Sequence, residues 1–499
     1  MISKIYSAVN IGYDGNLVEV ECDSNKGLPR FNIVGLADKA VNESKERVRG
    51  AMANSHFDFP NGHITVNLAP ANLPKDGTHF DLPMAIGLLV ISGQLLQKNV
   101  DGVLFAGELS LDGKLRPIRG ALSIAETARK NGLKTVIVPE ENAEQSALIK
   151  ETTVVGAKNL IDVVLHLIGE KIIEPTAAPK LGKVSVGDTS VSISDIRGQE
   201  SAKRALTIAA AGHHNILFTG PPGAGKTMLA KALTNLLPAP TYDELFEITK
   251  IHSIYGETNE IIYKRPFRSP HHTASFVAII GGGAKATPGE VSLSHHGVLF
   301  MDEIPEYPRQ SLEALRQPLE DHKIHISRAA GRVTYPANFM LVATKNPCPC
   351  GYLGDESHEC ECTQQQILNY QKRISGPLMD RIDMVVEVSR VPQKELLRPE
   401  RDDAGEDDSL RQQVQKARKT QAIRNRGKTN SALSNKTIVA KARLSPKAEN
   451  LLTTAAERLK LSARGYFKVI KVARTIADLN DSDEITEKEI SEALQYRQQ

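Results

Sequence analysis

A glycine-rich segment in the middle of the chain has the residue types and spacing of a phosphate-binding loop. The segment GPPGAGKT, residues 220–227, fits the pattern G-x-x-x-x-G-K-[ST], with an apolar strand before it and a helix-forming run after it. Backbone N–H groups of such a loop close around phosphate oxygens, and the helix N-terminus adds partial positive charge. Lys226 is expected to reach the β- and γ-phosphates, and the Thr227 hydroxyl to ligate Mg²⁺. The predicted nucleotide contacts are Gly220, Pro221, Pro222, Gly223, Ala224, Gly225, Lys226, Thr227 and Met228.

Two acidic residues follow a second apolar strand. In the stretch GVLFMDEI, residues 297–304, Asp302 and Glu303 follow the apolar run. Asp302 is expected to hold the Mg²⁺ shell. Glu303 can orient and deprotonate an attacking water. Two acids after a strand can also form a solvated loop, but the phosphate-binding loop in the same chain favours catalysis.

Two more polar residues are candidates for the same reaction. Asn346 ends the apolar stretch NFMLVATKN, where an amide can sense the γ-phosphate. Arg381 lies just before another apolar stretch, and in an oligomer it could enter the neighbouring subunit's site and stabilise the charge of phosphoryl transfer. For any single arginine, an ordinary surface salt bridge is the default interpretation.

Four of the chain's five cysteines lie within one short segment, NPCPCGYLGDESHECEC, residues 346–362. Four thiolates suit tetrahedral Zn²⁺, and Gly351 and Gly354 allow the chain to fold back between the two C-x-C pairs. The alternatives are free thiols or a redox pair, and His358 could replace one thiol. We expect a structural zinc that holds this loop as a DNA or inter-subunit contact. The predicted ligands are Cys348, Cys350, Cys360 and Cys362.

The elements that must position these residues suggest several domains of α/β type. A chain of 499 residues is too long for one core. Residues 1–170 mix strands, as in 63–70 and on both sides of an Asp112-Gly113 turn, with helices at 82–96 and 122–132. Residues 171–191 have the composition of a linker. From 192 to 390 short apolar strands alternate with helices, as in a parallel sheet, and 391–499 is mostly helical.

Composition sets the class of protein. Hydrophobic residues make up 40% and charged residues 24%, which is typical of a soluble globular protein. The formal net charge of +3 means that any nucleic-acid contact must come from local patches. The start of the chain has no signal-peptide pattern, and the few cysteines give no disulfide framework. We therefore expect a cytoplasmic protein.

The motifs occur in the order typical of an AAA+ ATPase, and more narrowly the chain resembles the YifB/ComM family, also called Mg-chelatase-like proteins. The segments that carry the resemblance span nearly the whole chain: RFNIVGLADKAVNESKERVR, ITVNLAPANLPKDGTHFDLP, RPFRSPHHTAS, NPCPCG, RISGPLMDRID and EALQYR. The resemblance implies a Lon-protease-like N-terminal domain, an AAA+ module of the Mg-chelatase/MCM type and a helical C-terminal lid. It also implies a hexameric ring with ATP and Mg²⁺ between subunits.

The resemblance further implies ATP-driven DNA helicase and branch-migration activity, which for ComM serves natural transformation. By position, Asp302 and Glu303 match the family's second nucleotide motif, Asn346 its first sensor and Arg381 its trans-acting finger. Arg464 matches the lid sensor, with Arg474 in reserve. The alternative function is a protein-remodelling ATPase such as a Mg-chelatase motor subunit, but that subunit is expected to lack the N-terminal domain and the cysteine loop.

The Lon likeness raises the possibility of a protease, which the residues exclude. Lon-type domains use a serine nucleophile with a lysine base. In this chain His79 stands at the serine position and Leu122 at the lysine position. We expect residues 1–170 to be a scaffold without protease activity, and His79 to be a packed or surface histidine.

Basic residues in three places are candidates for DNA contact. A predicted hairpin at 320–337 offers Lys323, Arg328 and Arg332, which could follow a phosphate backbone in a ring pore, although a solvated hairpin is equally expected. An insert at 265–290 offers Arg265, Arg268, His271, His272 and Lys285, with hydrogen bonding the favoured role of the two histidines. The run 411–428 has seven basic residues and no acid, which favours DNA slightly over a solvated helix face: Arg411, Lys416, Arg418, Lys419, Arg424, Arg426 and Lys428.

Overall fold

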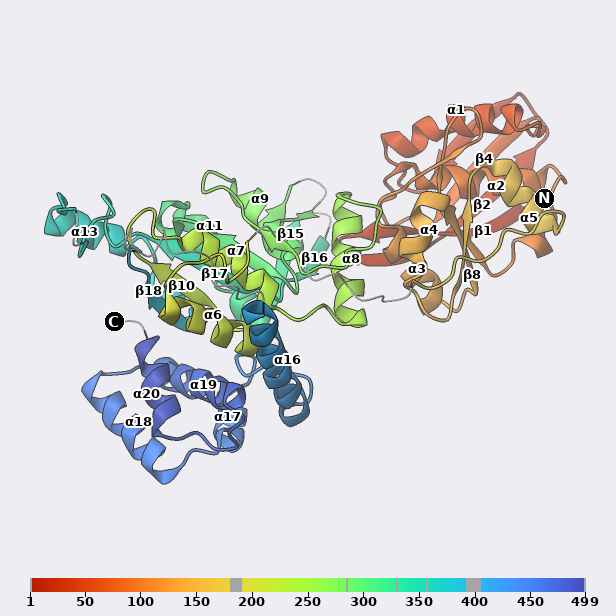
Figure 1. The fold of residues 1–499 in the computed structure, drawn as a ribbon. Coiled ribbons are helices and arrows are strands. Elements are labelled where there is room, and N and C mark those ends of the chain that lie inside the picture. The colour runs from red at the N-terminus through yellow and green to blue at the C-terminus, as the bar shows by residue number, and fades with distance from the viewer. Residues whose placement is uncertain are drawn as a thin grey trace. The chain divides into compact units, whose positions relative to one another are not determined.

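The computed structural model describes residues 2–179, 191–283, 286–328, 331–355, 358–391 and 405–497 (Figure 1). Part of the predicted linker, Lys285 and the side chain of Arg328 therefore lie outside the described part of the chain. The chain divides into two compact units. The first comprises Met1–Lys183, Tyr242–Ile262 and Ser327–Tyr335, and the second comprises Val184–Thr241, Tyr263–Ile326 and Pro336–Gln499.

A seven-stranded sheet forms the centre of the first unit, in the order β3-β4-β2-β1-β5-β8-β9. Strands β1, β2 and β4 pair antiparallel, whereas β3–β4, β1–β5, β5–β8 and β8–β9 are parallel. The strands are β1 (Ile2–Ile11), β2 (Asp14–Asn25), β3 (Arg30–Val34), β4 (His63–Ala69), β5 (Val103–Phe105), β8 (Thr135–Pro139) and β9 (Thr153–Ala157). The strand predicted at 63–70 is confirmed as β4.

The helices of this unit are α1 (Lys39–Asn54), α2 (Asp81–Ile91), α3 (Ala121–Lys130), α4 (Glu140–Ser146) and α5 (Leu160–Ile168). Helix α2 is apolar on all sides and buried over Asp81–Val90, which confirms a buried helix, although it ends at Ile91 rather than at the predicted residue 96. The stretch 102–118 differs in detail from the prediction. Only β5 joins the large sheet, and the Asp112-Gly113 turn closes a separate small pair, β6 (Glu108–Leu109) and β7 (Leu115–Arg116).

Two segments from the middle of the chain cluster with the N-terminal residues. Helix α8 (Tyr242–Tyr255) packs on α3, where Lys250 Nζ lies 2.6 Å from Glu126 Oε2 in a buried ion pair. The other segment is Ser327–Tyr335 of the hairpin formed by β15 (Lys323–Arg328) and β16 (Gly331–Pro336). The sequence places both segments within the predicted 192–390 module, so the first unit is not continuous along the chain.

A five-stranded parallel sheet forms the centre of the second unit, in the order β11-β14-β17-β10-β18. The order differs from the chain order because β17, late in the sequence, lies between β10 and β14. The strands are β10 (Ile216–Thr219), β11 (Phe267–Arg268), β14 (Val298–Met301), β17 (Met340–Lys345) and β18 (Met384–Glu387). The helices before the lid are α6 (Glu200–Gly212), α7 (Lys226–Leu236), α9 (Phe276–Ile280), α10 (Glu290–Leu293), α11 (Arg309–Ala314), α12 (Pro318–Asp321), α13 (Gln364–Gln371) and α14 (Gly376–Met379).

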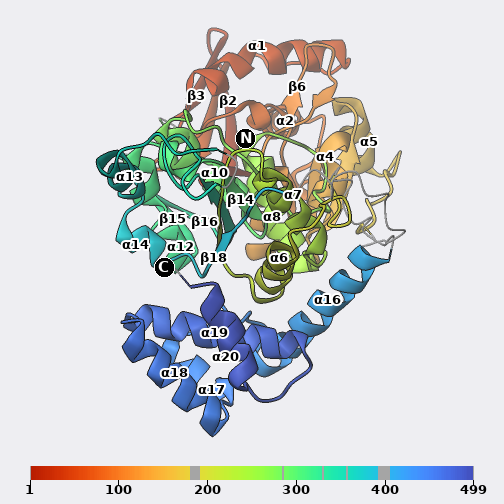
Figure 2. The same cartoon turned by 60° about the vertical axis from the view of Figure 1, so that its left-hand side comes forward.

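The C-terminal part of the second unit is helical, as predicted. Its helices are α16 (Glu406–Asn425), α17 (Asn435–Ala442), α18 (Pro446–Arg458), α19 (Ala463–Leu479) and α20 (Glu487–Gln495). Figure 2 shows α17–α20 grouped together, with α16 leading to them. Ser434, Ser445, Ser462 and Thr486 cap the last four helices by accepting backbone N–H hydrogen bonds. One hydrophobic core runs from the sheet into these helices.

In the part of the chain that the structure describes, no helix combines the length and apolar character needed to cross a membrane.

Candidate nucleotide-binding site and cysteine cluster

The predicted phosphate-binding loop connects β10 to α7. Strand β10 is buried over Ile216–Phe218, and the loop begins directly after its last residue. Gly225 is the N-cap of α7 with φ +86°, a left-handed conformation that side chains rarely adopt. Thr227 and Lys226 form the first turn of α7, so the helix N-terminus and its free N–H groups face the loop.

Lys226 ties this loop to the end of β17. Its ammonium group donates to Pro221 O and to Asn346 Oδ1, each at 2.9 Å. Burial lowers the pKa of Lys226, while the charges of Asp302 and Glu303 act in the opposite direction. The two predicted residues Lys226 and Asn346, 120 positions apart, therefore share one site.

The acidic pair after β14 lies in the same site. Thr227 Oγ1 lies 3.4 Å from Asp302 Oδ2, which places both predicted Mg²⁺ ligands side by side. Asn346 Nδ2 lies 3.4 Å from Glu303 Oε1. Glu303 has φ +49°, a strained conformation for a residue other than glycine and one that clusters at functional sites.

Thr344 was not among the predicted site residues, yet it connects both acids. Its hydroxyl donates to Asp302 Oδ1 at 2.6 Å and accepts from the backbone N–H of Glu303 at 2.9 Å. It is fully buried in β17, one residue beyond Ala343, which pairs with Met301 at the end of β14. The sequence feature that could have indicated Thr344 is a single hydroxyl residue at the end of the apolar run MLVA.

The two predicted arginines meet at one carboxylate. Arg381 donates to Arg316 O at 2.9 Å and to Pro377 O at 2.8 Å, and forms an ion pair with Glu320. Arg464 Nη2 lies 3.6 Å from the other oxygen of Glu320. A cavity of about 570 Å³ opens beside Arg381 and Glu320. Glu320 is a further residue that sequence reasoning missed.

The reserve candidate for the lid sensor, Arg474, is wrong. Its side chain is 1% exposed and is held by Asp478 and by backbone oxygens of Ala442, Ser482 and Asp483. A guanidinium whose donors are used inside the lid has none left for a phosphate. Arg464, which is 51% exposed, remains the candidate.

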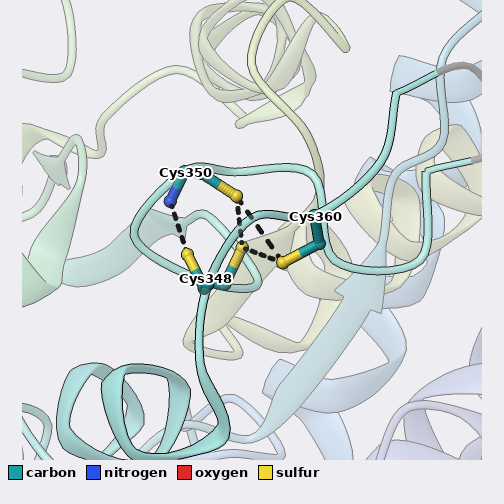
Figure 3. Close-up of side chains that lie close together, drawn as sticks. Cys348, Cys350 and Cys360 are labelled. Carbon is teal, nitrogen blue, oxygen red and sulfur yellow. Dashed lines mark hydrogen bonds between the residues drawn. The ribbon is translucent and has the colours of Figure 1, made fainter.

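The four clustered cysteines lie close together, and Figure 3 labels three of them, Cys348, Cys350 and Cys360. Cys348 Sγ lies 3.3 Å from Cys350 Sγ and 3.6 Å from Cys360 Sγ, and all four sulfurs lie within 4.8 Å of one another. In a tetrahedral site with Zn–S bonds of about 2.3 Å, neighbouring sulfurs would be about 3.8 Å apart. Backbone hydrogen bonding at Tyr352 lowers the pKa of Cys350 to about 6, whereas burial and the neighbouring thiols raise the pKa of Cys360 and of Cys362. The donor set and its geometry fit Zn²⁺.

His358 does not join the sulfurs, contrary to the alternative considered from sequence. Its ring stacks on Tyr352 with centroids 4.9 Å apart, and its Nδ1 lies 3.1 Å from Arg390 Nη1. The fifth cysteine, Cys22, is buried alone in the first unit, where burial raises its pKa to about 12.

Two of the predicted DNA contacts are engaged inside the protein. Arg265 donates to Pro238 O at 2.6 Å and to His296 O at 2.7 Å. Arg268 forms a bidentate pair with Glu290 at 2.6 and 2.9 Å. These arginines hold the module together, and the structure does not support them as DNA contacts. His271 makes a local hydrogen bond with Thr273, the kind of role that was favoured for it.

The basic run 411–428 is also mostly structural. Arg418 donates to Ala210 O in α6 at 2.6 Å, and Arg424 pairs with Asp478 in α19 at 2.6 Å. Arg411 and Lys416 pair with Asp408 and Asp481. Helix α16 thus joins the lid to the sheet-bearing part of the unit, and only Lys419, Arg426 and Lys428 remain as exposed candidates from this run.

The chain is similar to known proteins over nearly its whole length. Three family descriptions match consecutive parts of the chain: "Magnesium chelatase, subunit ChlI" at residues 192–396, "Subunit ChlI of Mg-chelatase" at 20–142 and "Magnesium chelatase, subunit ChlI C-terminal" at 406–497. Competence protein ComM of Haemophilus influenzae is 44% identical over 99% of this chain and 97% of its own length. Uncharacterized protein YifB of Escherichia coli is 40% identical over the same shares. The chain belongs to the YifB/ComM family.

The chain therefore has the Mg-chelatase-like AAA+ architecture of this family, including the C-terminal helical region. A Lon protease of Trichlorobacter lovleyi is 29% identical over 33% of this chain and 21% of its own length. The family resemblance assigns His79 and Leu122 to the two positions of the Lon-type dyad. His79 is 8% exposed, its Nε2 lies 2.9 Å from Ala8 O, and burial lowers its pKa to about 4. It is a packed histidine, as expected, and Leu122 is fully buried.

Proposed function

We propose that the protein is an ATP-hydrolysing motor that acts on DNA as a hexameric ring. The observation that carries the proposal is the convergence of Lys226, Asp302, Glu303 and Asn346 on the adjoining ends of three parallel strands. The similarity to a competence protein supports DNA as the track. By analogy with ComM, the reaction would be unwinding or branch migration of DNA during recombination, as in natural transformation.

Each residue of the site has a defined task in phosphoryl transfer. Thr227 and Asp302 would hold Mg²⁺, which neutralises charge on the phosphates. Lys226 and the loop N–H groups would bind the phosphate oxygens, and Glu303 would orient and deprotonate the attacking water. Asn346 bridges Lys226 and Glu303, so it is placed to register the γ-phosphate. Arg381 and Arg464 would complete a neighbouring subunit's site or close the lid on the nucleotide.

For the DNA contact we propose the β15–β16 hairpin, where Lys323 and Arg332 are exposed. Their charges can follow a phosphate backbone without reading its sequence. Remodelling of a partner protein is the second candidate function, and the match to the description of a Mg-chelatase subunit favours it. DNA-dependent hydrolysis separates the two.

We also propose a structural Zn²⁺ at the four clustered sulfurs. All ligand positions would be taken by cysteine, so the metal would have no open site for catalysis. Four neighbouring cysteines without a disulfide between them fit a reducing compartment, which we infer to be the cytoplasm.

The test is ATP hydrolysis by the purified protein with and without single-stranded and branched DNA. Lys226→Ala and Glu303→Gln are the blanks. We expect DNA to stimulate hydrolysis and both variants to abolish it. ATP hydrolysis at the same rate with and without DNA would contradict the DNA motor and favour remodelling of a partner protein.

A matched pair of double variants tests the hairpin. Lys323→Glu with Arg332→Glu should weaken DNA binding and flatten its dependence on salt, while hydrolysis without DNA is retained. Lys436→Glu with Lys447→Glu makes the same change of charge at exposed lid positions and should leave DNA binding unchanged. Equal effects of the two pairs would contradict the hairpin assignment.

A further inference from the structure

We propose that the described parts of the cysteine loop, residues 348–355 and 358–362, form a metal-held brace for the phosphate-binding loop, so that metal occupancy sets ATP affinity. The inference rests on the nucleotide and zinc sites proposed above and adds a function that connects them. We call this segment the knuckle. Its position relative to the phosphate-binding loop carries the argument.

The inner turn of the knuckle contacts the phosphate-binding loop directly. Gly351 is buried with φ +88°, and a Cβ at this position would lie 2.7 Å from Pro222 Cδ and 3.9 Å from Asn346 Cγ. Only a glycine permits both the backbone conformation and this approach. Pro222 is the third residue of the phosphate-binding loop, so the knuckle forms part of its wall.

The outer part of the knuckle is fastened to the strand on the other side of the loop. Arg390 lies 3.2 Å from Asp355 Oδ2 and 5.5 Å from the centre of the Tyr352 ring. Arg390 follows β18, and Val388 just before it donates its N–H to Thr219 O at 2.8 Å. Thr219 is the residue that precedes the phosphate-binding loop. The knuckle therefore approaches the phosphate-binding loop at Pro222, and Arg390 links it to the segment that pairs with the residue before this loop.

The chain itself supplies a third connection. Asn346, which accepts from Lys226, lies two residues before Cys348, and Cys348 is fully buried. A metal at the sulfurs would fix Cys348 and Cys350 on either side of the turn that leads to Gly351. Holding these residues would also hold the Asn346 amide against the Lys226 ammonium group.

The described residues of the knuckle have little apolar core. The knuckle's one aliphatic residue, Leu353, is 40% exposed, and Cys350, Cys360 and Cys362 are each only partly buried. A short segment without an apolar core needs cross-links to offset the entropy of ordering. Metal coordination by the four sulfurs is the cross-link that this sequence offers.

The first experiment compares ATP affinity of the full-length protein in three states: as purified in reductant, stripped by a chelator, and resupplied with Zn²⁺ alone. Zinc is measured by elemental analysis and affinity with a fluorescent ATP analogue. We expect about one zinc per chain and about tenfold weaker ATP binding after stripping, restored by Zn²⁺, because the loss of one well-aligned hydrogen bond to the phosphates weakens binding by about this factor.

A pair of glycine variants separates the brace from the metal. Gly351→Ala would push a methyl group into Pro222, whereas Gly354→Ala, at a similar φ of +80°, would meet nothing within 4 Å. Both should keep zinc. Gly351→Ala should weaken ATP binding about tenfold, and Gly354→Ala should bind as the wild type does.

The outcomes are distinct. Zinc bound at one per chain, with ATP affinity unchanged by stripping and by Gly351→Ala, would overturn the brace and leave the ATPase proposal intact. Absence of zinc from protein that binds ATP would overturn the metal site. Failure of the zinc-loaded wild type to bind ATP would reject the proposed function itself. The brace would be established if stripping and Gly351→Ala each weaken ATP binding while Gly354→Ala does not.

Discussion

At the scale of single residues, Thr344 shows how one hydroxyl organises the hydrolysis site. It holds the Asp302 carboxylate and the Glu303 backbone at once, at 2.6 and 2.9 Å. A carboxylate that loses this donor can rotate away from the position in which Mg²⁺ would be bound. Thr344 does not touch the nucleotide in this argument, so it is a positioning residue.

We predict that Thr344→Val lowers kcat for ATP hydrolysis by about tenfold, the effect of removing a hydrogen bond worth about 1.4 kcal/mol. Affinity for ATP should change little, because Lys226 and the loop N–H groups are untouched. Thr207→Val is the matched control, since Thr207 is also buried and donates within α6 at 3.0 Å. Steady-state kinetics with separately measured ATP affinity make the test. Equal losses in both variants would point to general destabilisation.

His79 gives a prediction about pH. Because burial lowers its folded pKa to about 4 from the ordinary 6.5, folding favours the neutral ring. This contribution to stability is fully present above pH 6.5 and is lost as the pH falls toward 4. We expect His79→Gln to reduce the loss of stability of the first unit over this range, measured by hydrogen exchange of α2. The exposed His56→Gln should keep the wild-type pH dependence, and a His79→Gln profile identical to wild type would contradict the prediction.

At the scale of elements, the insertion of β17 between β10 and β14 explains the site. Parallel strands present their carboxyl ends at one edge, so the residues that follow three neighbouring strands meet there. The register aligns Thr219 with Lys345 and Met301 with Ala343. Asn346 can therefore reach Lys226 on one side and Glu303 on the other, while Thr344 holds the two acids that follow β14.

Helix α16 is the element that sequence reasoning interpreted differently. Its basic residues bind carbonyl groups of α6 and carboxylates of the lid, with Asp478 at the centre. Asp478 is fully buried and contacts Arg424 at 2.6 Å, Arg474 at 3.1 Å and Asn430 at 2.9 Å. A run of positive charge along a helix cannot reveal from sequence that its partners come from elsewhere in the fold.

We predict that Asp478→Asn destabilises the lid by about 3 kcal/mol, because it leaves the buried Arg474 without its counter-charge. Asp481→Asn is the control. Its partner Lys416 is 66% exposed, so the effect should stay below about 1 kcal/mol. Hydrogen exchange of α19 as a function of denaturant measures both. Similar protection in the two variants would show that the buried network does not stabilise the lid.

At the scale of the whole molecule, the proposed ring requires Arg381 to act on a neighbour. Within one chain its hydrogen bonds are made to Arg316 O, Pro377 O and Glu320. Glu320 also pairs with Arg464, so one carboxylate holds both arginines that the family resemblance assigns to the nucleotide. The trans-acting role remains a prediction that only an assembly can test.

We predict complementation between two inactive variants. Arg381→Ala keeps its own phosphate-binding loop, and Lys226→Ala keeps its arginine. In equal mixtures, random assembly would pair them productively at about a quarter of the interfaces, so about a quarter of wild-type hydrolysis should return.

Mixing Lys226→Ala with Glu303→Gln is the control for complementation. Both residues belong to the same side of the proposed interface, so no activity should return. Native mass spectrometry confirms that mixed rings form. Mixed rings without recovery, or recovery in the control mixture, would contradict a trans-acting Arg381.

Much of the nucleotide site could be predicted from sequence because its chemistry is local. The loop 220–227 needs glycines, a lysine and a hydroxyl at fixed spacing. Strand ends such as Asp302-Glu303 can be recognised because polar residues follow an apolar run. The four cysteines were recognisable for the same reason, since their spacing within 15 residues allows them to converge. Short-range spacing thus decides which groups can act together on a phosphate or a metal.

The remaining features depended on contacts between distant segments. The position of β17 between β10 and β14 made Asn346 a bridge between Lys226 and Glu303. Long-range partners turned Arg265, Arg268 and most of α16 from DNA candidates into internal supports. The approach of Gly351 to Pro222 joins residues 129 positions apart. The local sequence specified the donors and acceptors, but only the packing of the sheet and lid decided which of them find partners within the chain, because charges and hydroxyls do not encode the distance at which their partners fold.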